Sequence, residues 1–330
     1  MSSPSDSLRV TFLGPLASFS HQAALDLFPA SQPTPPTLLP TPSFADALAA
    51  VQNNTADYAV VPIENSTNGA VVQVLDLLAD RDSRCSDLAV CGEYYLTVHH
   101  CLLVRPADAE GVEDPSTLYP RIAKLYTHPQ AWGQCDTFLS THFKGVERQD
   151  APSTSKAAAI VANTPLTNSD ELPAAIASPL AATQHSLHIL VRNIEDRANN
   201  TTRFLILRNK SSTSRAVNSG EGRDFYPHAG PTRKLKALIS FTIDHEKPGA
   251  LVEALNVFRN HGLNLTSIGS RPGQVVAWQY IFFVECEWLR GRNEGEGEGE
   301  GEIVERAMVE LKGKTGKCRD LGRWGDRLGG

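Results

Sequence analysis

The sequence lacks the long apolar runs that membrane and secreted proteins carry. None of its apolar stretches approaches the roughly 18 residues that a membrane-spanning helix needs. The first ten residues, MSSPSDSLRV, contain no apolar signal core and lead directly into a strand pattern. We therefore expect a cytoplasmic protein that has no membrane partner.

The spacings that hold metal ions or redox centres are also missing from the sequence. The six cysteines form no C-x-x-C pair, and the ten histidines form no HExxH motif. Several cysteines stand in apolar stretches such as HHCLLV and FFVECEW, which indicates buried thiols in a reducing compartment. A net charge of −6 argues against a nucleic-acid backbone as partner. We expect no metal, no cofactor and no nucleic acid.

The overall composition is typical of a globular protein, since 41% of the residues are hydrophobic and 21% are charged. The length of 330 residues fits about two domains. Residues 8–209 alternate short apolar runs with Ala-rich helical patterns, which predicts α/β units. The polar stretch 210–234 predicts a linker. Residues 235–330 predict a second module in the βαββαβ order of ferredoxin-like folds. Within it, residues 293–302 contain a run in which Glu alternates with Gly. This run predicts a solvated loop, with a regulatory cation or partner site as the alternative.

In the first region, several strands end in polar turns directly before a helix. Helix caps are expected at Thr127 and Ser178, and at either Ser153 or Ser155. Each helix start offers unpaired backbone N–H groups and the positive end of a dipole. If several starts meet at one sheet edge, they form a pocket for a small anion. The alternative is that they are ordinary connections between strands and helices.

The tripeptide Thr202-Arg203-Phe204 places a hydroxyl beside a cation at the start of a predicted strand, Phe204–Arg208. The arginine can bind a carboxylate through two hydrogen bonds, and the threonine can donate to a departing oxygen. The alternative is a turn threonine that caps the strand beside an arginine exposed on its edge.

Short pieces of sequence between residues 12 and 204 follow one another in the order found in one enzyme family. The pieces are Phe12-Leu13-Gly14-Pro15 with Ser18-Phe19-Ser20, Val61-Pro62-Ile63-Glu64-Asn65-Ser66, His100-Cys101-Leu102-Leu103, His128-Pro129-Gln130 with Gln134-Cys135, Ser153-Thr154-Ser155, Ala174-Ala175-Ile176-Ala177, and Asn200-Thr201-Thr202-Arg203-Phe204. Through them the chain resembles prephenate dehydratase followed by a C-terminal ACT regulatory domain, which the second module matches at Pro248-Gly249-Ala250-Leu251 and Ser270-Arg271-Pro272.

The resemblance implies an α/β catalytic region, residues 8–209, with two lobes and a cleft between them, similar to type-II periplasmic binding proteins. Lobe one is expected at residues 8–112 and 188–209, and lobe two at residues 113–187. The ACT domain, residues 235–330, is expected to have the ferredoxin-like βαββαβ fold.

The activity that the resemblance implies is the conversion of prephenate to phenylpyruvate, water and carbon dioxide in L-phenylalanine biosynthesis. Loss of the ring carboxylate and the hydroxyl together makes the ring aromatic, so the driving force lies within the substrate. The protein needs only to hold the dianion and assist departure of the hydroxyl. Two alternatives are an arogenate dehydratase and a non-catalytic small-anion sensor.

The roles of individual residues also follow from the resemblance. Thr202 is expected to donate a proton or a strong hydrogen bond to the leaving hydroxyl. Arg203 is expected to orient a substrate carboxylate, with a structural ion pair as the alternative. Further substrate contacts are expected from Asn65, Ser66, Thr67 and Phe204 in lobe one, and from Gln130, Ser153, Thr154 and Ser155 in lobe two.

The ACT resemblance implies feedback regulation by L-phenylalanine and a homodimer or homotetramer. Gly269 stands where family members commonly have Glu, which removes a side chain from the regulatory motif and leaves the strength of inhibition open. The residues expected to bind the effector are Pro248, Gly249, Ala250, Leu251, Asn264, Leu265, Ser270, Arg271 and Pro272.

Overall fold

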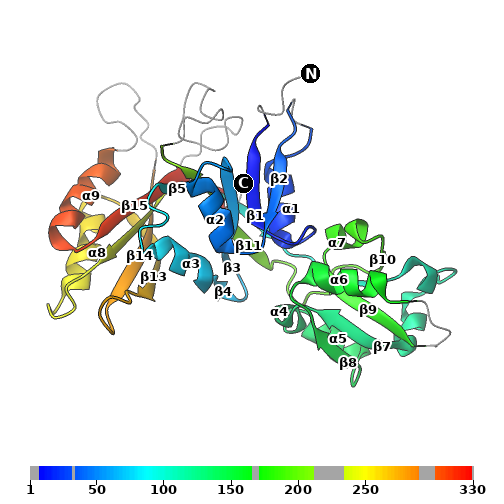
Figure 1. The fold of residues 1–330 in the computed structure, drawn as a ribbon. Coiled ribbons are helices and arrows are strands. Elements are labelled where there is room, and N and C mark those ends of the chain that lie inside the picture. Colours follow the sequence, from blue (N-terminus) through cyan, green and yellow to red (C-terminus); the bar gives the residue numbers. More distant parts are fainter. Residues whose placement is uncertain (1–6, 32–33, 166–170, 212–233, 290–301, 329–330) are drawn as a thin grey trace.

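The computed structural model describes residues 7–31, 34–165, 171–211, 234–289 and 302–328. They form two lobes and a C-terminal module, with lobe one in the middle (Figure 1). Nearly all of the predicted linker, 210–234, and of the Glu/Gly loop, 293–302, lies outside the described residues. Across the described ranges, no helix is long and apolar enough to cross a membrane.

Lobe one is built on a sheet in which β1, β2 and β3 run parallel and β11 runs antiparallel between β3 and β5. Its helices pack against the two faces of this sheet, so two separate clusters of buried side chains form. The elements are β1 (Arg9–Leu13), α1 (Phe19–Leu27), β2 (Thr37–Thr41), α2 (Phe44–Gln52), β3 (Tyr58–Asn65), β4 (Gly69–Ala70), α3 (Val72–Ala79), β5 (Leu88–Thr97) and β11 (Thr201–Asn209).

Lobe two has its own five-stranded sheet in the order β10-β6-β9-β7-β8. The strands are β6 (Cys101–Val104), β7 (Ile122–Thr127), β8 (Glu147–Asp150), β9 (Leu172–Ala177) and β10 (His188–Val191). The helices are η2 (Pro106–Asp108), η3 (Pro115–Arg121), α4 (Pro129–Trp132), α5 (Asp136–His142), α6 (Thr154–Asn163) and α7 (Pro179–Gln184).

The predicted lobe boundaries were wrong, because β6 and β10 belong to the sheet of lobe two rather than to lobe one. The buried run Cys101–Val104 pairs with both β9 and β10, and this pairing completes the edge of the second sheet. The chain therefore crosses between the lobes at residues 98–100 and 192–200. The two crossings are bonded to each other, since Val98 N–H donates to Asn200 O (2.7 Å) and Ile194 N–H donates to His100 O (2.9 Å).

The C-terminal module contains the elements that the sequence predicts, in the predicted order. Its four strands lie in the antiparallel order β13-β14-β12-β15, and both helices pack into one core against this sheet. The elements are β12 (Lys234–Thr242), α8 (Ala250–Asn260), β13 (Asn264–Pro272), β14 (Tyr280–Leu289), α9 (Glu302–Lys314) and β15 (Cys318–Gly325).

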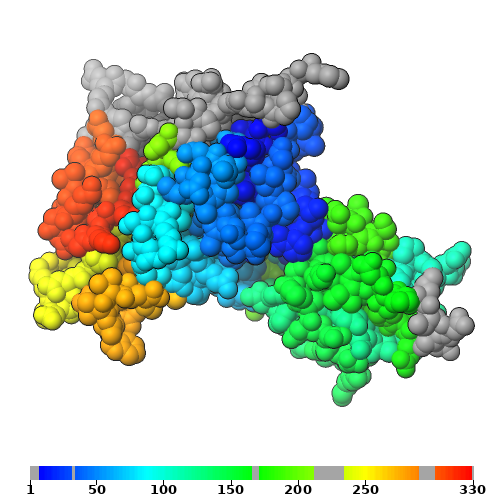
Figure 2. All heavy atoms as spheres, in the orientation of Figure 1, coloured from blue at the N-terminus to red at the C-terminus, as the bar shows by residue number. Residues whose placement is uncertain are grey.

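The module is joined to lobe one through both sheet and core. Strand β15 pairs with β5 at Gly322 and Val90, so the two sheets form one continuous sheet. Leu205 and Leu207 of β11 share a buried cluster with Leu238, Phe283 and Trp324 of the module. Figure 2 shows the yellow-to-red atoms of the module against lobe one, away from the green atoms of lobe two. The strand that carries Thr202 is therefore also in contact with the module.

Candidate functional site

The carboxyl ends of the parallel strands of each lobe are followed by helix starts. Ser18 caps α1, Ser153 caps α6 and Ser178 caps α7, each by accepting a hydrogen bond from a backbone N–H within the first turn. The caps predicted at Ser153 and Ser178 are confirmed. The cap predicted at Thr127 was wrong, because its buried hydroxyl donates to Ile176 O (2.7 Å) and His128 caps α4 instead.

The two sets of strand ends meet at the turn between β1 and α1. Ser155 Oγ, in the first turn of α6, donates to Leu16 O of lobe one (2.6 Å). Ala17 is buried in the cluster that the helices of lobe two form with β6 and β9. The start of α6 is therefore held directly against lobe one, as a site at facing sheet edges requires.

Thr202 lies at the same edge of lobe one and is held by Asn65 of β3. The two residues face each other across the β11–β3 pair, and Asn65 Nδ2 donates to Thr202 Oγ1 (3.0 Å) and to Asn200 Oδ1 (2.9 Å). Because Thr202 Oγ1 accepts this bond, its own proton can be donated elsewhere. Thr202 is partly exposed, so that proton can reach a bound molecule.

The orientation of the Asn65 amide is fixed by the turn that follows β3. Asn65 Oδ1 accepts from the backbone N–H groups of Thr67 (3.0 Å) and Asn68 (2.9 Å). Two backbone donors on the oxygen require the NH₂ group to point toward Thr202. The hydrogen bond between Asn65 and Thr202 therefore has a defined direction.

Ser66 and Thr67 complete this polar turn. Ser66 Oγ accepts from the Thr201 N–H (2.9 Å), and Thr67 Oγ1 donates to Asn200 Oδ1 (3.3 Å). Three of the predicted lobe-one residues, Asn65, Ser66 and Thr67, are thus brought together around Thr202. Sequence reasoning assigned no role to Asn200, although it stands in the quoted piece beside Thr201.

Arg203 points to the other face of the sheet and forms the ion pair that the sequence left open as the alternative. Its Nη2 lies 2.5 Å from Glu93 Oε2 and 2.7 Å from Glu285 Oε2. Burial opposes the charge of Arg203, but the carboxylates of Glu285 and Glu93 outweigh that effect and raise its pKa. The guanidinium is therefore committed to two protein carboxylates.

Phe204 does not line the site, so the prediction that it contacts substrate was wrong. Its side chain is 1% exposed and packs with Phe12, Ile206 and the helix α1 residue Ala24. Since side chains alternate along a strand, Phe204 shares the face of Thr202 but lies deeper in the core. It anchors the strand beneath the hydroxyl.

The remaining predicted residues of lobe two have different surroundings. Ser153 caps α6 and Thr154 is buried, while Gln130 is exposed at the start of α4. Ser155 Oγ lies 3.1 Å from His185 Nε2, but its proton is donated to Leu16 O, so the histidine does not receive it as a general base would. None of these side chains has a hydrogen bond to Thr202 or Asn65 within the described ranges.

Sequence reasoning missed a contact at the lobe crossing. His100 Nε2 is hydrogen-bonded to Gln134 Oε1 of lobe two (2.7 Å), and its ring packs edge-on against Phe19 of α1 (5.7 Å). Burial lowers the pKa of His100, so its imidazole is neutral. The His-Cys-Leu-Leu piece could have indicated it, since a polar residue there opens an apolar strand.

The residues predicted to be regulatory fall into two groups at opposite ends of β13. At one end, Arg271 Nε and Nη2 pair with the Asp76 carboxylate of α3 (2.8 and 2.9 Å), and Pro272 O accepts from Arg81 (2.9 Å). At the other end, Asn264 is exposed and Leu265 is 36% exposed.

The loop before α8 lies at the Pro272 end of β13. Tyr280 of β14 lies opposite Pro272 in the β13–β14 pair, and its backbone N–H donates to Nε2 of His245 in that loop (3.0 Å). Gly249 directly precedes α8 and has a φ of 84°, which glycine adopts without strain, and the first residue of the helix, Ala250, is buried. Ser270 is exposed near this end.

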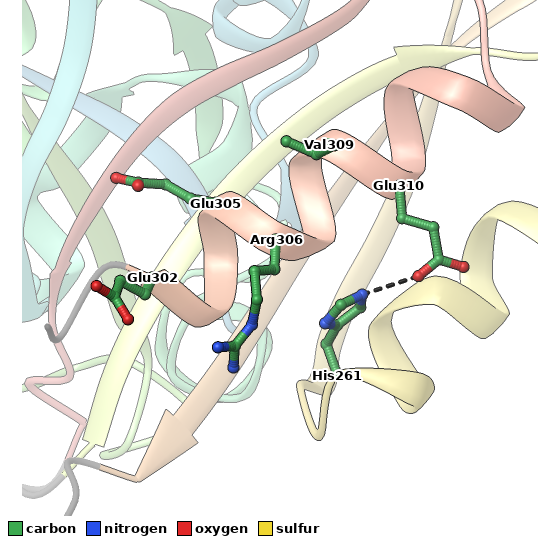
Figure 3. A pocket seen from close by; sticks show the side chains of 6 residues that line it. All are labelled: His261, Glu302, Glu305, Arg306, Val309 and Glu310. Atoms are coloured by element: carbon green, nitrogen blue, oxygen red, sulfur yellow. Dashed lines mark hydrogen bonds and ion pairs between the residues drawn. The ribbon is translucent and has the colours of Figure 1, made fainter. Parts of the chain in front are cut away.

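A separate hollow of about 500 Å³ lies along α9, beside His261, which directly follows α8. Figure 3 shows its side chains along α9, with His261 bonded to Glu310 (2.8 Å). Three glutamates, Glu302, Glu305 and Glu310, line it beside a single arginine, Arg306. This excess of carboxylates would repel a dianion, so we place the candidate site at the Thr202 edge instead.

Comparisons with known proteins agree on one family. The model of the prephenate dehydratase family matches residues 10–212. A bifunctional chorismate mutase/prephenate dehydratase of Aquifex aeolicus is 35% identical over 317 residues, which cover 96% of this chain and 73% of that protein. A probable prephenate dehydratase of Saccharomyces cerevisiae is 35% identical over 307 residues, covering 85% of this chain and 87% of that protein.

Two solved structures have a similar fold along nearly the whole chain. A prephenate dehydratase from Arthrobacter aurescens in complex with L-Phe has a TM-score of 0.74 and 26% identity, covering 97% of this chain and 90% of that one. A structure described as the quorum-quenching acylase GqqA has a TM-score of 0.71 and 27% identity, covering 97% of this chain and 98% of that one.

Proposed function

The chain belongs to the prephenate dehydratase family, so its reaction is the decarboxylative dehydration of prephenate, and we propose that Thr202, held by Asn65, assists departure of the hydroxyl. The bond from the ring to its carboxylate breaks and releases carbon dioxide. The electron pair of that bond enters the ring, and the C–O bond breaks as the hydroxyl leaves. The departing oxygen takes one proton, supplied in net terms by the solvent, and leaves as water. Phenylpyruvate keeps the side-chain carboxylate, so no oxidant or reductant is consumed.

The observation that carries this proposal is the direction of the bond between Asn65 and Thr202. Asn65 donates to Thr202 Oγ1, and this polarises the hydroxyl toward donating its own proton. A threonine is a weak acid, so its contribution is stabilisation of charge that develops on the leaving oxygen. The same geometry disfavours acyl transfer, for which the hydroxyl would need a base that accepts its proton.

We place the side-chain carboxylate of prephenate at the start of α6. Ser153 caps this ten-residue helix, and Ser155 holds its first turn against lobe one. Backbone N–H groups at a helix start favour an anion. Gln130, at the start of α4, and the hydroxyls of Ser66 and Thr67 would contact the same substrate from either side. In this arrangement Arg203 has a structural role, because two buried carboxylates already neutralise it.

Turnover of prephenate measured against turnover of arogenate tests the substrate. Phenylpyruvate should form from prephenate, with one carbon dioxide released per product, and arogenate should give little phenylalanine. A higher kcat/KM for arogenate than for prephenate would show that arogenate, the amino analogue of prephenate, is the preferred substrate. Absence of turnover of either acid would favour the anion sensor.

Replacing Asn65 by aspartate is expected to lower kcat by roughly 10²-fold, the cost of losing one preorganised donor. A carboxylate at this position would accept the Thr202 proton rather than donate to its oxygen. The added charge would also raise KM for a dianion. Initial rates of phenylpyruvate formation at several prephenate concentrations measure both effects.

Asn68→Asp is the matched control, because it adds the same charge to the same turn at an exposed position. It should raise KM modestly and leave kcat within about threefold of the parent, since exposed charges are screened. Equal losses of kcat in the two variants would contradict the donor role of Asn65.

We further propose that the C-terminal module is an ACT domain that binds L-phenylalanine between two chains. The residues Pro248–Leu251 lie near one end of β13, whereas Asn264 and Leu265 lie at its other end. Eight residue steps along a strand span roughly 26 Å, so one amino acid cannot bridge both groups within a chain. A second chain that packs with β13 in the opposite direction would bring the two groups together. Strand β13 is an exposed sheet edge with Ile268 52% exposed, which supports such pairing and a homodimer or homotetramer.

Gly269→Glu is expected to tighten L-phenylalanine binding about tenfold, because a carboxylate could bond the effector's ammonium group. A side chain added at Gly269 meets nothing within 4 Å, so thermal stability should be unchanged. Calorimetric titration with L-phenylalanine measures the affinity. No heat of binding in either protein, with no inhibition, would end the regulatory proposal.

A further inference from the structure

An ion network is buried where the C-terminal module meets the strand of Thr202. Arg203, the residue after Thr202, donates through Nε to Glu93 of β5 (2.9 Å) and contacts Glu285 of β14 through Nη2 (2.7 Å). Lys236 of β12 contacts the same Glu93 (3.1 Å) and also Asp326 (2.7 Å). Two cations and three carboxylates from both parts of the chain thus form one connected group.

The network is too deeply buried for stability alone to explain it. The side chains of Glu93, Glu285 and Arg203 are 0%, 8% and 12% exposed. Buried ion pairs give up their hydration, and apolar residues of similar size often stabilise a fold as well or better. What such a network does provide is a fixed direction and distance between the groups that it joins. Here it joins β14 of the module to the residue beside the proposed catalytic hydroxyl.

The pairing of β11, the strand of Thr202, with β3 becomes irregular beyond Arg203. The register between β11 and β3 shifts between Arg203 and Phe204. Phe204 is paired with Pro62, which has no N–H to give to the ladder. Because this backbone pairing is interrupted between Arg203 and Phe204, the side-chain contacts of Arg203 add a restraint on the strand one residue from Thr202.

A hydroxyl on the edge strand fixes the carboxylate of Glu285 in turn. Leu265 pairs with Cys286 and Ser267 pairs with Glu285, so Thr266 is the extra residue of a β-bulge in β13. Bulges re-aim side chains, and Thr266 Oγ1 donates to Glu285 Oε1 (3.0 Å). Side-chain contacts therefore lead from the edge strand through Glu285 to Arg203, which adjoins Thr202 in the chain.

We propose that Glu285, acting through Arg203, is a positioning residue for the Thr202 hydroxyl, and that Thr266 orients Glu285 from the edge strand. The inference rests on the proposed role of Thr202. It gives the C-terminal module a part in turnover even when no effector is present. It also provides a route by which a molecule bound beside Thr266 would alter kcat.

The test compares Glu285→Gln in two backgrounds, the parent chain and the Thr202→Ala variant. Glutamine keeps the shape of Glu285 and can still accept from Thr266, but it lacks the charge that clamps Arg203. In the parent, kcat should fall roughly tenfold with KM within about twofold, as expected for a misplaced catalytic group. In Thr202→Ala there is no hydroxyl left to position, so the same substitution should change kcat less than about twofold. The slow background is followed in single turnovers with enzyme in excess of prephenate.

Glu287→Gln, two residues further along β14, is the control and should leave kcat unchanged in both backgrounds. Thr266→Val keeps the branched shape of Thr266 and removes its hydrogen bond to Glu285, so it should lower kcat of the parent about threefold in a chain that still folds. Equal losses from Glu285→Gln in the two backgrounds, or no loss in the parent, would overturn the proposal. An unchanged kcat in Thr202→Ala itself would instead refute the proposed role of Thr202, and the positioning inference would fall with it.

Discussion

Thr202→Ala is expected to lower kcat for phenylpyruvate formation by about 10²–10⁴-fold, the range expected for losing a side chain that stabilises charge on the leaving oxygen. KM should change little, because the hydroxyl acts on the leaving group in the transition state rather than on the bound dianion. The hydroxyl of the partly exposed Thr202 accepts from Asn65 Nδ2, which also donates to Asn200 Oδ1 and Thr201 O, so removing the hydroxyl leaves Asn65 with partners. Stability should therefore be nearly unchanged, and the loss can be assigned to chemistry.

Two neighbouring substitutions serve as controls for this prediction. Thr202→Ser keeps the hydroxyl and should retain kcat within roughly tenfold. Thr201→Ala removes the adjacent hydroxyl, which donates to Asn199 O (3.1 Å), and should have little effect on turnover. A Thr202→Ala variant with near-normal kcat, or a Thr201→Ala variant that is equally slow, would contradict the assignment.

Gly322→Ala is expected to be the most destabilising single substitution considered for this chain. Gly322 has a φ of 133°, and a Cβ at this position would lie 2.1 Å from Val90 O and 2.5 Å from Val90 N. Because the obstructing atoms are backbone, β15 would have to move away from β5, and the shared sheet would open. We expect a loss on the order of 3–5 kcal/mol in the free energy of unfolding, as for other substitutions that combine strain with disrupted packing.

Urea unfolding followed by circular dichroism measures this loss. Gly313→Ala is the matched control, since Gly313 lies in α9 and an added Cβ meets nothing within 4 Å. That change should stabilise the chain by roughly 0.5–1 kcal/mol through helix propensity. A Gly322→Ala protein as stable as the parent would mean that the junction between β15 and β5 does not hold the module to lobe one.

The fold could be predicted wherever local pattern decides it. The order of strands and helices in the C-terminal module follows from apolar runs of strand length, the amphipathic helix α8 and the helix stop at Gly262. The lobe boundaries could not be predicted, because a buried run such as Cys101–Val104 fits either sheet. Only pairing with β9 and β10, far along the chain, decides which sheet receives it.

The candidate site was predictable where neighbours in sequence remain neighbours in space. Asn65, Ser66 and Thr67 share one turn, and pairing of β3 with β11 brings that turn to Thr202. The surroundings of Arg203 were not predictable, because Glu93 and Glu285 come from strands distant in sequence. A glutamate inside an apolar strand, as in LAVCGEYYLT or YIFFVECEWL, was the available signal that a buried cation would be found opposite.

A crystal structure of the Thr202→Ala variant with bound prephenate tests the central claim most directly. We expect the ring hydroxyl of prephenate to lie beside Asn65 and residue 202, with its side-chain carboxylate at the start of α6. Prephenate bound elsewhere, for example in the hollow along α9 beside His261, with the Asn65 turn left empty, would contradict the account.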